Sequence, residues 1–515
     1  MAGKEGRGVK LSDLLETIKP IRVTGWIQDK VKSSEIGSIH YRAQDVRPGG
    51  LFVAIKGLKA DGHDFIEDAL VRGASAIVTE KPVAADSICI EVSSTRRVLA
   101  SMSSRFYENP SETLNIIGIT GTNGKTTTAF LIESILSSAG FHVGVIGTVN
   151  YRYSGKEFSN PMTTPESLDL QRILKDMAKD GITHVVMEVS SHSLDLFRVD
   201  NCWMDVGVFT NFSQDHLDYH KNMAAYWKAK QRLFSEILKI GPKKERAVAV
   251  LNCNDEKGKS LIKIFSGTSV TVGHSSDNLI RDRTFETDLS GIKGEIITPQ
   301  CLFHFESSLT GAYNLENILC AVGVGFAFRL PLDTIKNGIE TMLSVPGRFE
   351  RIPNGSGKFV FVDYAHTPGA LDNVLSALKS MAVGRIICVF GCGGDRDREK
   401  RPQMGEIAEN LCDLAVITSD NPRNEEPREI IQQICVGIQK ECLHHYNPSD
   451  LKKGFEKKGY VIEPDRRKAI HLGISAAHAG DTVLIAGKGH EKYQIVGNKI
   501  FSFDDRLEAE KILLN

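Results

Sequence analysis

Short runs of β-branched and other apolar residues alternate along the chain with longer segments in which apolar residues recur every three or four positions. A continuous apolar run of five to eight residues predicts a strand buried on both faces, and the longer pattern predicts an amphipathic helix. Repeated alternation of the two predicts parallel sheets covered by helices on both faces. We therefore expect an α/β fold.

The runs divide the chain into three regions. A length of 515 residues exceeds a single core and suggests about three domains at roughly 150 residues each. We expect a small α/β domain over 1–110, a mononucleotide-binding domain over 111–345 and a second doubly wound (Rossmann-like) domain over 346–515. The predicted strands are 51–57 and 74–80 in the first region, 114–120, 142–149, 183–190, 205–211 and 246–252 in the second, and 359–365, 385–391, 413–419 and 482–489 in the third.

Three polar segments interrupt this pattern. The turn-rich stretch 267–310 predicts an antiparallel appendage, and it is followed by a helical pattern over 312–328. Pro346 and Gly347 make 342–352 a plausible hinge between the second and third regions. The stretch 441–464 predicts a polar surface insertion.

Composition excludes several classes of protein. There are 63 Lys and Arg against 64 Asp and Glu, so no overall field attracts nucleic acid or an anionic membrane. The first residues hold no apolar core of a signal peptide, and no stretch reaches the ~18 apolar residues of a membrane span. Ten cysteines are scattered without a CxxC pair, and we assign Cys388 and Cys392 to packing. We expect a cytoplasmic monomer.

Candidate chemistry begins at "GITGTNGKTTTAF", residues 118–130, which lies between a predicted strand and a predicted helix. Backbone N–H groups and the helix dipole bind phosphate oxygens in that setting. Lys125 would reach the β- and γ-phosphates and Thr126 a Mg²⁺ ion. Ile119 stands where a strict Walker A motif has glycine, so the loop is of a particular subtype.

Glu188 ends one predicted strand and His216 follows another. The carboxyl ends of parallel strands share one edge of a sheet, where doubly wound folds bind ligands. Each residue alone also fits a structural polar group.

The loop "TGTNGKTTT" resembles the ATP loop of the Mur ligase and folylpolyglutamate synthase superfamily. Further motifs that resemble the Mur ligases extend across most of the chain: "MTTPES", "MEVSSHSL", "FTNFSQDHLDYH", "YWKAKQRLF", "GAYNLENILCAV", "VPGRFE", "VDYAHTP", "GCGGDRDREKRP", "SDNPRNEEP" and "GKGHE". The resemblance implies an ATP-dependent amide ligase of bacterial cell-wall synthesis that works through an acyl phosphate. It is strongest to members that join meso-diaminopimelate to UDP-N-acetylmuramoyl-L-alanyl-D-glutamate.

The resemblance also implies the residues that handle ATP. Lys125, Glu188, His216 and Lys230 would be catalytic, and Thr126, Glu188, His216 and Lys230 as a carbamate (N6-carboxylysine) would bind Mg²⁺. On composition alone Lys230 would be an exposed helix lysine. His366 is a further ATP candidate, and Arg348 could instead form a salt bridge at the domain boundary. The implied ATP contacts are Gly121, Thr122, Asn123, Gly124, Lys125, Thr126, Thr127, Asn314, Asn317, Arg348 and Asp363.

The UDP-substrate contacts implied by the resemblance are Thr163, Thr164, Ser190 and Arg198. Two departures affect this region. Arg42, Ala43 and Gln44 replace the family's uridine-binding Asp-Ser-Arg, and Met162 replaces an asparagine. Uridine would therefore be held by backbone groups or by other side chains.

Selectivity for the amino acid is implied by "DNPR", because lysine-adding relatives lack this arginine. Diaminopimelate differs from lysine by a distal carboxylate, which the Arg423 guanidinium can bind with two hydrogen bonds. Without the resemblance, a proline turn at the end of a strand would be the preferred interpretation. The implied diaminopimelate contacts are Arg396, Asp420, Asn421, Pro422, Arg423, Gly487 and Glu491.

Three alternatives remain open. A folylpolyglutamate synthase would share the phosphate loop and the ligase chemistry, but the first region and "DNPR" argue against it. A P-loop kinase or GTPase would leave the second doubly wound domain without a role. A non-enzymatic scaffold would not need so many intact site motifs.

Overall fold

The computed structural model describes residues 8–25, 34–57, 60–83, 87–438, 443–451 and 454–514. By contacts within the chain it divides into two compact units. Unit 1 comprises Met1–Arg283, Ile296–Phe303 and Glu316–Ile339, and unit 2 comprises Thr284–Glu295, His304–Leu315 and Glu340–Asn515. No helix among the described residues is both long and apolar enough to cross a membrane.

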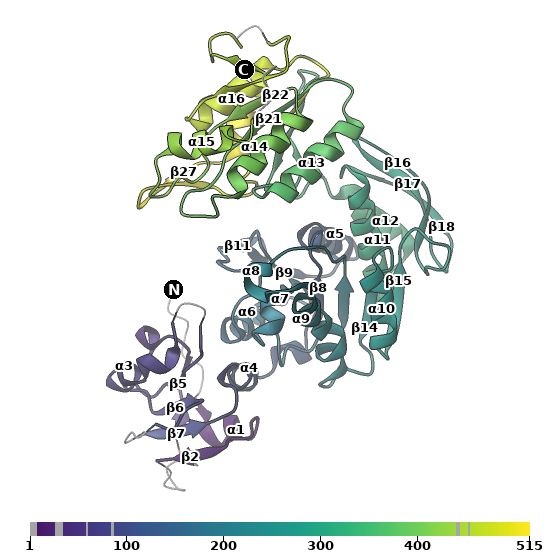
Figure 1. Ribbon diagram of the computed structural model, residues 1–515. Helices are drawn as coiled ribbons and strands as arrows, with labels where there is room; N and C mark the ends of the chain where they lie inside the picture. The colour runs from purple at the N-terminus through teal and green to yellow at the C-terminus, as the bar shows by residue number, and fades with distance from the viewer. Residues whose placement is uncertain are drawn as a thin grey trace. The chain divides into compact units, whose positions relative to one another are not determined.

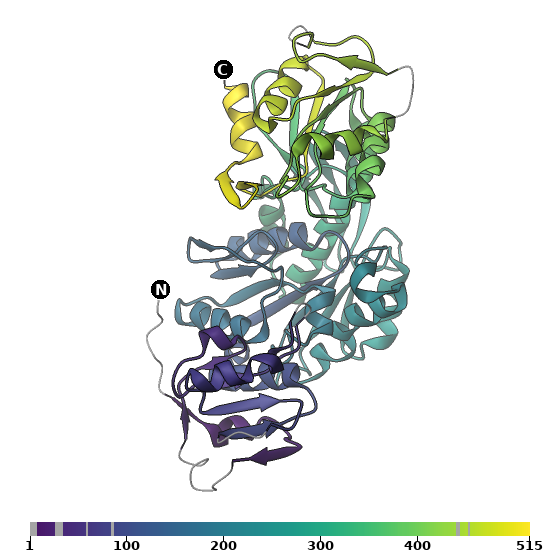
Figure 2. The ribbon, with the colours of Figure 1, turned by 60° about the vertical axis from the view of Figure 1, so that its left-hand side comes forward.

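Unit 1 begins with a small five-stranded sheet in the order β2-β7-β6-β5-β4, the purple part of the ribbon in Figure 2. The β2 strand pairs antiparallel with β7, and the other pairs are parallel. Helices α1, α3 and α4 accompany this sheet. The bounds are β2 Arg22–Thr24, β4 Ile39–His40, β5 Leu51–Val53, β6 Ala76–Thr79, β7 Ile88–Glu91, α1 Leu11–Leu15, α3 Ile66–Val71 and α4 Thr95–Phe106.

The larger sheet of unit 1 has eight strands in the order β11-β10-β9-β12-β8-β13-β14-β15. The six strands from β9 to β15 in this order run parallel, which confirms the α/β class predicted for this region. The strands are β8 Asn115–Thr120, β9 Val143–Ile146, β10 Tyr151–Tyr153, β11 Lys156–Phe158, β12 His184–Glu188, β13 Val206–Phe209, β14 Val248–Asn252 and β15 Thr268–Val272. The helices are α5 Lys125–Ser138, α6 Ser167–Lys179, α7 Ser191–Asp195, α8 Leu217–His220, α9 Met223–Ser235 and α10 Glu256–Ile264.

The predicted appendage over 267–310 is partly wrong. Its first strand, β15, pairs parallel with β14 and forms the edge of the large sheet. The remainder forms a separate three-stranded sheet of β16 (Arg281–Asp288), β17 (Gly291–Ile297) and β18 (Leu302–Ser307). Two helices follow it, α11 (Ala312–Ala327) and α12 (Leu332–Thr341).

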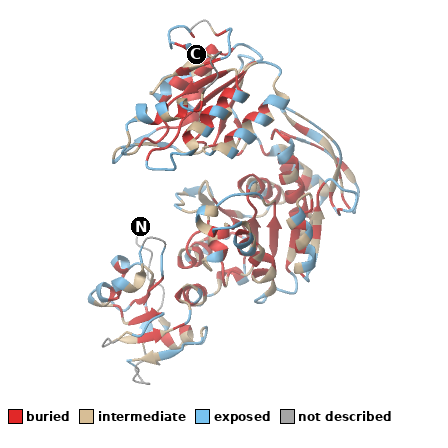
Figure 3. Ribbon diagram, viewed as in Figure 1, coloured by how far each residue is buried: buried red, intermediate tan, exposed pale blue. Residues whose placement is uncertain are grey.

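Unit 2 contains a seven-stranded sheet in the order β19-β20-β25-β21-β22-β24-β23, in which only β19 is antiparallel to its neighbour. The α13, α14 and α15 helices pack on one face and α16 and α17 on the other, and Figure 3 shows the strands between them buried. The strands are β19 Glu350–Arg351, β20 Phe359–Asp363, β21 Ile386–Phe390, β22 Leu414–Ile417, β23 His444–Tyr446, β24 Gly459–Ile462 and β25 Thr482–Ala486. The helices are α13 Pro368–Met381, α14 Lys400–Leu411, α15 Pro427–Cys435, α16 Arg466–Ala476 and α17 Asp505–Leu513, labelled in part in Figure 1.

The prediction of a surface insertion over 441–464 is partly wrong for the residues described there, 443–451 and 454–464. This stretch supplies β23 and β24, which extend the sheet beyond β22, and Val461 is fully buried. A hairpin of β26 (Tyr493–Val496) and β27 (Lys499–Ser502) lies apart from that sheet in the hydrogen-bond pattern.

Candidate active site

The phosphate loop joins β8 to α5 and depends on two glycines with positive φ. Gly121 has φ 154° and Gly124 has φ 83°. A Cβ atom on Gly121 would lie 1.9 Å from the Thr210 hydroxyl oxygen, and one on Gly124 would lie 2.2 Å from the Asn317 amide oxygen. Any larger residue at these positions would therefore displace the walls of the loop.

Neighbouring elements hold the loop open. Asn123 donates its backbone N–H to Asn211 Oδ1 (2.9 Å) and accepts from Thr210 Oγ1 at its carbonyl (2.6 Å). Lys125 opens the α5 helix, and its Nζ donates to the carbonyls of Gly121 (3.0 Å) and Thr122 (2.9 Å). The ammonium group thus lies over the loop, where phosphate oxygens would replace the carbonyls as its partners.

Glu188 ends β12 beside this loop, as predicted for a residue at the carboxyl end of a parallel strand. Thr126 donates to Glu188 Oε2 (3.1 Å), and Thr148 donates through its hydroxyl to Oε2 and through its backbone N–H to Oε1, both at 2.9 Å. Thr148 follows the carboxyl end of β9, another parallel strand of this sheet, so its position in the sequence could have predicted it. The carboxylate is 1 % exposed and held by hydroxyl and amide donors.

Lys230 on α9 is buried, 2 % exposed, so an exposed helix lysine is the wrong interpretation. Its Nζ donates to the Gly121 carbonyl at 2.6 Å and lies 4.6 Å from the centre of the Tyr226 ring. Burial, together with repulsion from the Lys125 ammonium, lowers the pKa of Lys230 well below its usual value. No carboxylate pairs with this amine among the residues that the structure describes.

His216 precedes α8 with a left-handed backbone, φ 52°. Its Nε2 lies 3.5 Å from the Asp215 carboxylate, and its ring centre is 5.0 Å from that of His192. Burial lowers the pKa of His216 despite Asp215. Within the described ranges, no set of three His, Cys, Asp or Glu side chains is arranged to hold a metal ion.

The four predicted UDP-substrate residues adjoin Glu188. Thr164 donates to the Glu188 carbonyl (2.9 Å), and its hydroxyl lies 3.4 Å from that of Ser190. Thr163 contacts the Thr148 hydroxyl (3.1 Å), and Arg198 donates through Nη1 to the Thr164 carbonyl (3.3 Å). Thr148 and Thr164 thus connect these four side chains to Glu188.

Glu166, which was not predicted from the sequence, fixes Arg198 in place. One of its carboxylate oxygens lies 3.0 Å from Arg96 Nη1 and 3.3 Å from Arg198 Nε. Arg96 belongs to α4, so the carboxylate ties the N-terminal sheet's helix to the substrate arginine. The position of Glu166 directly after "TTP" in the motif "MTTPES" could have indicated a role beside the predicted substrate residues.

The residues that depart from the family pattern lie in two separate places. Ala43 is buried in a short 3-10 turn, Ala43–Asp45, whereas Arg42 and Gln44 are exposed. Met162 is half-buried.

The two candidate asparagines occupy the start of α11. Asn317 accepts a hydrogen bond from the Thr128 hydroxyl (3.2 Å) at the oxygen that also adjoins Gly124. Asn314 donates to the Thr310 carbonyl (2.7 Å). Both are buried, at 4 % exposure.

In unit 2, Asp363 ends β20 and is fixed by backbone donors. Its carboxylate accepts from the N–H groups of Phe349 (2.6 Å) and Ala365 (2.7 Å), while burial raises its pKa and the nearby Arg348 opposes that rise. The Arg348 guanidinium lies 5.0 Å from the Tyr364 ring centre, and its buried Nε has no hydrogen-bond partner among the described residues. His366 contacts the Tyr364 carbonyl through Nδ1 (2.9 Å).

Arg423 lies in the loop after β22, and it makes contacts beyond those of a proline turn. It has a left-handed backbone, φ 52°, and exchanges backbone hydrogen bonds with the β26–β27 hairpin, to Ile495 (3.1 Å) and from Gly497 (2.7 Å). Its Nη1 donates to the Gly394 carbonyl (2.8 Å) in the loop after β21. Adjacent Pro422 is buried, whereas Arg396 in the β21 loop is exposed.

The remaining predicted amino-acid contacts meet at Lys488, which was not predicted. Its fully buried Nζ donates to Asn421 Oδ1 (2.9 Å) and lies 3.3 Å from Asp420 and 3.7 Å from Glu491. Asn421 in turn donates to Glu491 (2.9 Å). Burial alone would raise the pKa of Asp420, but the nearby positive charges, chiefly those of Lys488 and Arg466, together outweigh burial and the pKa is lowered. Gly487, with φ 117°, precedes this lysine at the end of β25.

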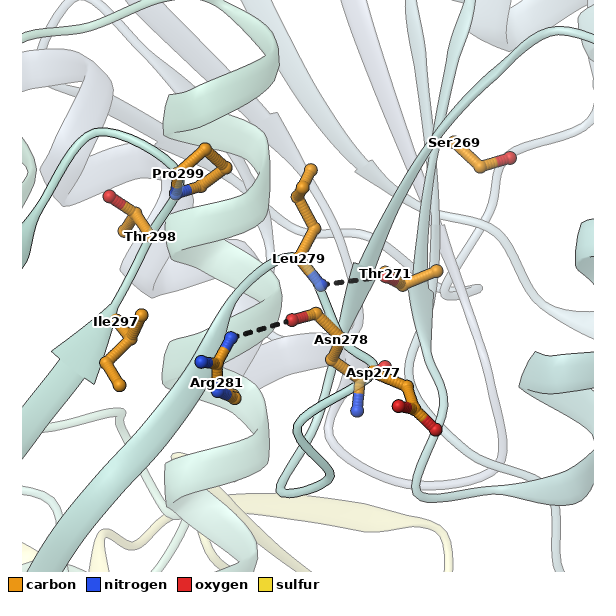
Figure 4. A pocket seen from close by; sticks show the side chains of 9 residues that line it. All are labelled: Ser269, Thr271, Asp277, Asn278, Leu279, Arg281, Ile297, Thr298 and Pro299. Carbon is orange, nitrogen blue, oxygen red and sulfur yellow. Dashed lines mark hydrogen bonds between the residues drawn. The ribbon is translucent and has the colours of Figure 1, made fainter.

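A separate open pocket of about 480 Å³ lies between β15 and the strand ends of the three-stranded sheet. Its polar groups already bond one another: Leu279 N–H donates to Thr271 Oγ1 (3.0 Å), and Arg281 donates to the Asn278 carbonyl (3.3 Å), as Figure 4 shows. None of the predicted site residues lines it.

Comparison with known proteins adds independent information. The chain matches three family models: the Mur ligase family catalytic domain over 35–107, the Mur ligase middle domain over 119–325 and the Mur ligase glutamate ligase domain over 347–489. It is 45 % identical to a protein of Geobacter metallireducens named UDP-N-acetylmuramoyl-L-alanyl-D-glutamate–2,6-diaminopimelate ligase, over 97 % of this chain and 98 % of that one.

Two solved structures are similar. One, of a UDP-N-acetylmuramoyl-L-alanyl-D-glutamate–2,6-diaminopimelate ligase, is 30 % identical with a TM-score of 0.70 and covers 98 % of this chain and 99 % of its own. A Mycobacterium tuberculosis folylpolyglutamate synthase complexed with ADP shares the fold at 18 % identity and a TM-score of 0.60. It covers 76 % of this chain and 92 % of its own.

Proposed function

The chain belongs to the Mur ligase family, and we propose that it is the ATP-dependent ligase that joins meso-2,6-diaminopimelate to UDP-N-acetylmuramoyl-L-alanyl-D-glutamate in peptidoglycan synthesis. The observation that carries the proposal is the 45 % identity to a protein of that name along nearly the whole length of both chains. We infer a cytoplasmic monomer, with the UDP-substrate domain at 1–110, the ATP domain at 111–345 and the amino-acid domain at 346–515.

ATP binding is supported by the phosphate loop and its lysine. The backbone N–H groups at the start of α5 and the Lys125 ammonium offer donors to phosphate oxygens. Asn317 shapes the loop at Gly124, and Asn314 lies one turn earlier on α11. Arg348 offers a guanidinium with an unused buried N–H, which suits an anionic partner.

The donor set around Glu188 fits Mg²⁺, which prefers oxygen ligands. The Thr126 hydroxyl and the Glu188 carboxylate are 3.1 Å apart beside the phosphate loop, and a bound Mg²⁺ would neutralise charge on the transferred phosphoryl group. His216 would complete the set from the loop after β13. We propose these three residues as Mg²⁺ ligands.

Lys230 fits a metal site only after chemical change, because an ammonium group repels a cation. We propose that its amine carries a carbamate: the nitrogen bonds to the carbon of CO₂ and loses a proton, and a carboxylate-like group results. Support comes from its position, since the amine is buried beside the phosphate loop and has no carboxylate partner in the described ranges. The lowered pKa of Lys230 favours the neutral amine that reacts with CO₂, and the carbamate would then supply oxygen ligands beside the phosphate loop.

The reaction then follows from the chemistry of amide formation. A γ-carboxylate oxygen of the D-glutamyl residue attacks the γ-phosphorus of ATP, the bond to the β-phosphate oxygen breaks, and ADP leaves. The diaminopimelate amine attacks the acyl carbon, phosphate departs and the amine loses a proton. Lys125 would stabilise the transferred phosphoryl group, and Arg198, held by Glu166, would orient the UDP substrate.

Selection of diaminopimelate would fall to the loops at the carboxyl edge of the unit 2 sheet. Arg423 and Arg396 supply positive charge, and the Asp420–Asn421–Glu491 network around Lys488 supplies acceptors for the ammonium end. Lysine would leave the Arg423 guanidinium without the distal carboxylate and would bind less tightly.

Phosphate release from ATP tests the proposal. With UDP-N-acetylmuramoyl-L-alanyl-D-glutamate present, we expect release with meso-diaminopimelate and far less with L-lysine. Equal turnover with lysine would refute the selectivity, and no turnover with either amino acid would refute the assignment. Turnover with a folate and glutamate would instead favour the folylpolyglutamate synthase alternative.

A further inference from the structure

Two loops carry most of the residues proposed to bind diaminopimelate. The β21 loop (391–399) holds Arg396, and the β22 loop (418–426) holds Asp420 to Arg423. They contact each other directly: the Gly394 N–H donates to the Asn421 carbonyl (2.9 Å), and Arg423 donates to the Gly394 carbonyl. The relative position of the two loops therefore determines the shape of the pocket.

An ion pair between a buried arginine and a half-buried glutamate joins these loops. Arg401, in the first turn of α14, is 0 % exposed and donates through Nη1 and Nη2 to the two carboxylate oxygens of Glu425, each at 2.9 Å. Its Nη2 also donates to the Gly393 carbonyl (3.1 Å) and its Nη1 to Gln433 on α15 (2.7 Å). Glu425 accepts the Asp395 N–H (2.6 Å). A single pair thus holds both loops and both helices that follow them.

We propose that the Arg401–Glu425 pair is a positioning device for amino-acid recognition, which sets the distance between Arg396 and Arg423. The inference rests on the proposed function, because it takes these two arginines as contacts of diaminopimelate. Neither member of the pair is among the proposed substrate contacts. A two-pronged pair fixes both distance and orientation, which an apolar contact of the same size does not do.

The β21 loop needs such a restraint. Asp395 has a left-handed backbone, φ 53°, and the residues from Asp395 to Glu399 are exposed. The Asp395 backbone N–H donates to Glu425, and the Asp395 carboxylate accepts from the Asn424 side chain (2.8 Å). Without Glu425 the loop would lose the partner of the Asp395 N–H and the ion pair of Arg398 (3.3 Å), and only the Gly393 carbonyl would still bond to Arg401.

A matched control exists in the same sheet. Arg385 donates through Nε to Asp481 Oδ1 (3.3 Å) and through Nη2 to Asp481 Oδ2 (2.5 Å), and Asp481 also accepts the backbone N–H of His478 (2.8 Å). This pair has the same two-pronged geometry with an added backbone donor. It lies at the amino ends of β21 and β25, the opposite edge of the sheet from the two loops.

The test compares Glu425→Gln with Asp481→Asn in the full-length enzyme. We expect Glu425→Gln to raise the KM for diaminopimelate by about tenfold or more, with the KM values for ATP and the UDP substrate changed less than about twofold. Asp481→Asn should leave all three KM values within about twofold, even where thermal unfolding shows a similar loss of stability. If Glu425→Gln does not fold, Arg401→Lys, which keeps the charge but not the two-pronged contact, is measured instead.

An unchanged diaminopimelate KM in a folded Glu425 or Arg401 variant would overturn the inference, as would an equal rise in Asp481→Asn. Arg423→Ala separates this failure from failure of the proposed pocket. If Arg423→Ala raises the diaminopimelate KM and Glu425→Gln does not, the positioning role alone is wrong. If Arg423→Ala has no effect, the pocket itself is misassigned.

Discussion

At the scale of single residues, burial distinguishes Lys230 from its neighbours on α9. Lys228, two positions earlier, is exposed, whereas Lys230 ends against the phosphate loop. Burying an amine with no carboxylate partner costs free energy, so the position demands a function or a modification. The position of Arg423 also costs free energy, because its left-handed backbone is strained. Two hydrogen bonds to the β26–β27 hairpin maintain it.

Replacing Lys230 with alanine should lower kcat by about 100-fold, because the oxygen ligands that the carbamate would offer to Mg²⁺ are lost. Lys228→Ala is the control and should retain activity. With ¹³C-labelled bicarbonate, the carbamate carbon should give an NMR signal in the wild type and in Lys228→Ala but not in Lys230→Ala. A wild-type enzyme that is fully active without that signal would contradict the carbamate.

Replacing Arg423 with alanine should raise the diaminopimelate KM by about 30-fold or more, because the distal carboxylate loses a charge-assisted contact. The ATP KM should change little. Arg428→Ala, on the exposed start of α15, is the control. Steady-state kinetics with each substrate varied in turn make the comparison, and a similar rise in both KM values would remove Arg423 from the amino-acid pocket.

Sequence motifs single out the residues proposed to contact substrates far better than the residues that hold them in place. Lys125 and Glu188 follow from their places after parallel strands. Glu166, Arg401 and Lys488 do not, because a charged side chain in a local window gives no sign of the partner far along the chain that buries it.

At the scale of elements, continuous apolar runs predicted the buried parallel strands of both units. The errors lie at the edges. The β15 strand has exposed and half-buried positions on its outer side, and β24 alternates buried with half-buried residues, so both read as polar segments. Their pairing with β14 and β22 is a tertiary property that single-window patterns do not contain.

The first residue of β12 provides a test of strand burial. His184 is 4 % exposed, and its ring stacks on Phe141 with centres 4.1 Å apart. Burial lowers the pKa of His184 to about 4, against a small opposing effect of Asp205. The folded state therefore binds fewer protons than the unfolded state between about pH 6.5 and 4, so the free energy of unfolding falls as pH drops through that window.

His184→Gln removes this group, and its free energy of unfolding should fall less steeply between pH 6.5 and 4 than that of the wild type. The difference should be on the order of 2 kcal/mol. Urea denaturation at several pH values measures it. Parallel curves for the two proteins would show that the folded-state pKa of His184 is close to its unfolded value.

At the scale of the whole molecule, the sequence predicts three functional regions, whereas contacts group the chain into two compact units. The N-terminal sheet joins the first unit partly through side chains such as Tyr41, which donates to Asp169 (2.7 Å), and Arg96, which pairs with Glu166. Leu289, from the turn between β16 and β17, packs in the core of unit 2. Apolar periodicity does not reveal such contacts between regions.

Product analysis in a direct competition tests the central claim of a diaminopimelate-adding ligase. The enzyme is supplied with ATP, UDP-N-acetylmuramoyl-L-alanyl-D-glutamate and equal concentrations of meso-diaminopimelate and L-lysine, and the products are resolved by mass spectrometry. We predict that the diaminopimelate tripeptide exceeds the lysine tripeptide by at least about 100-fold, and that Arg423→Ala narrows this ratio. Comparable amounts of the two tripeptides, or formation of neither, would contradict the account.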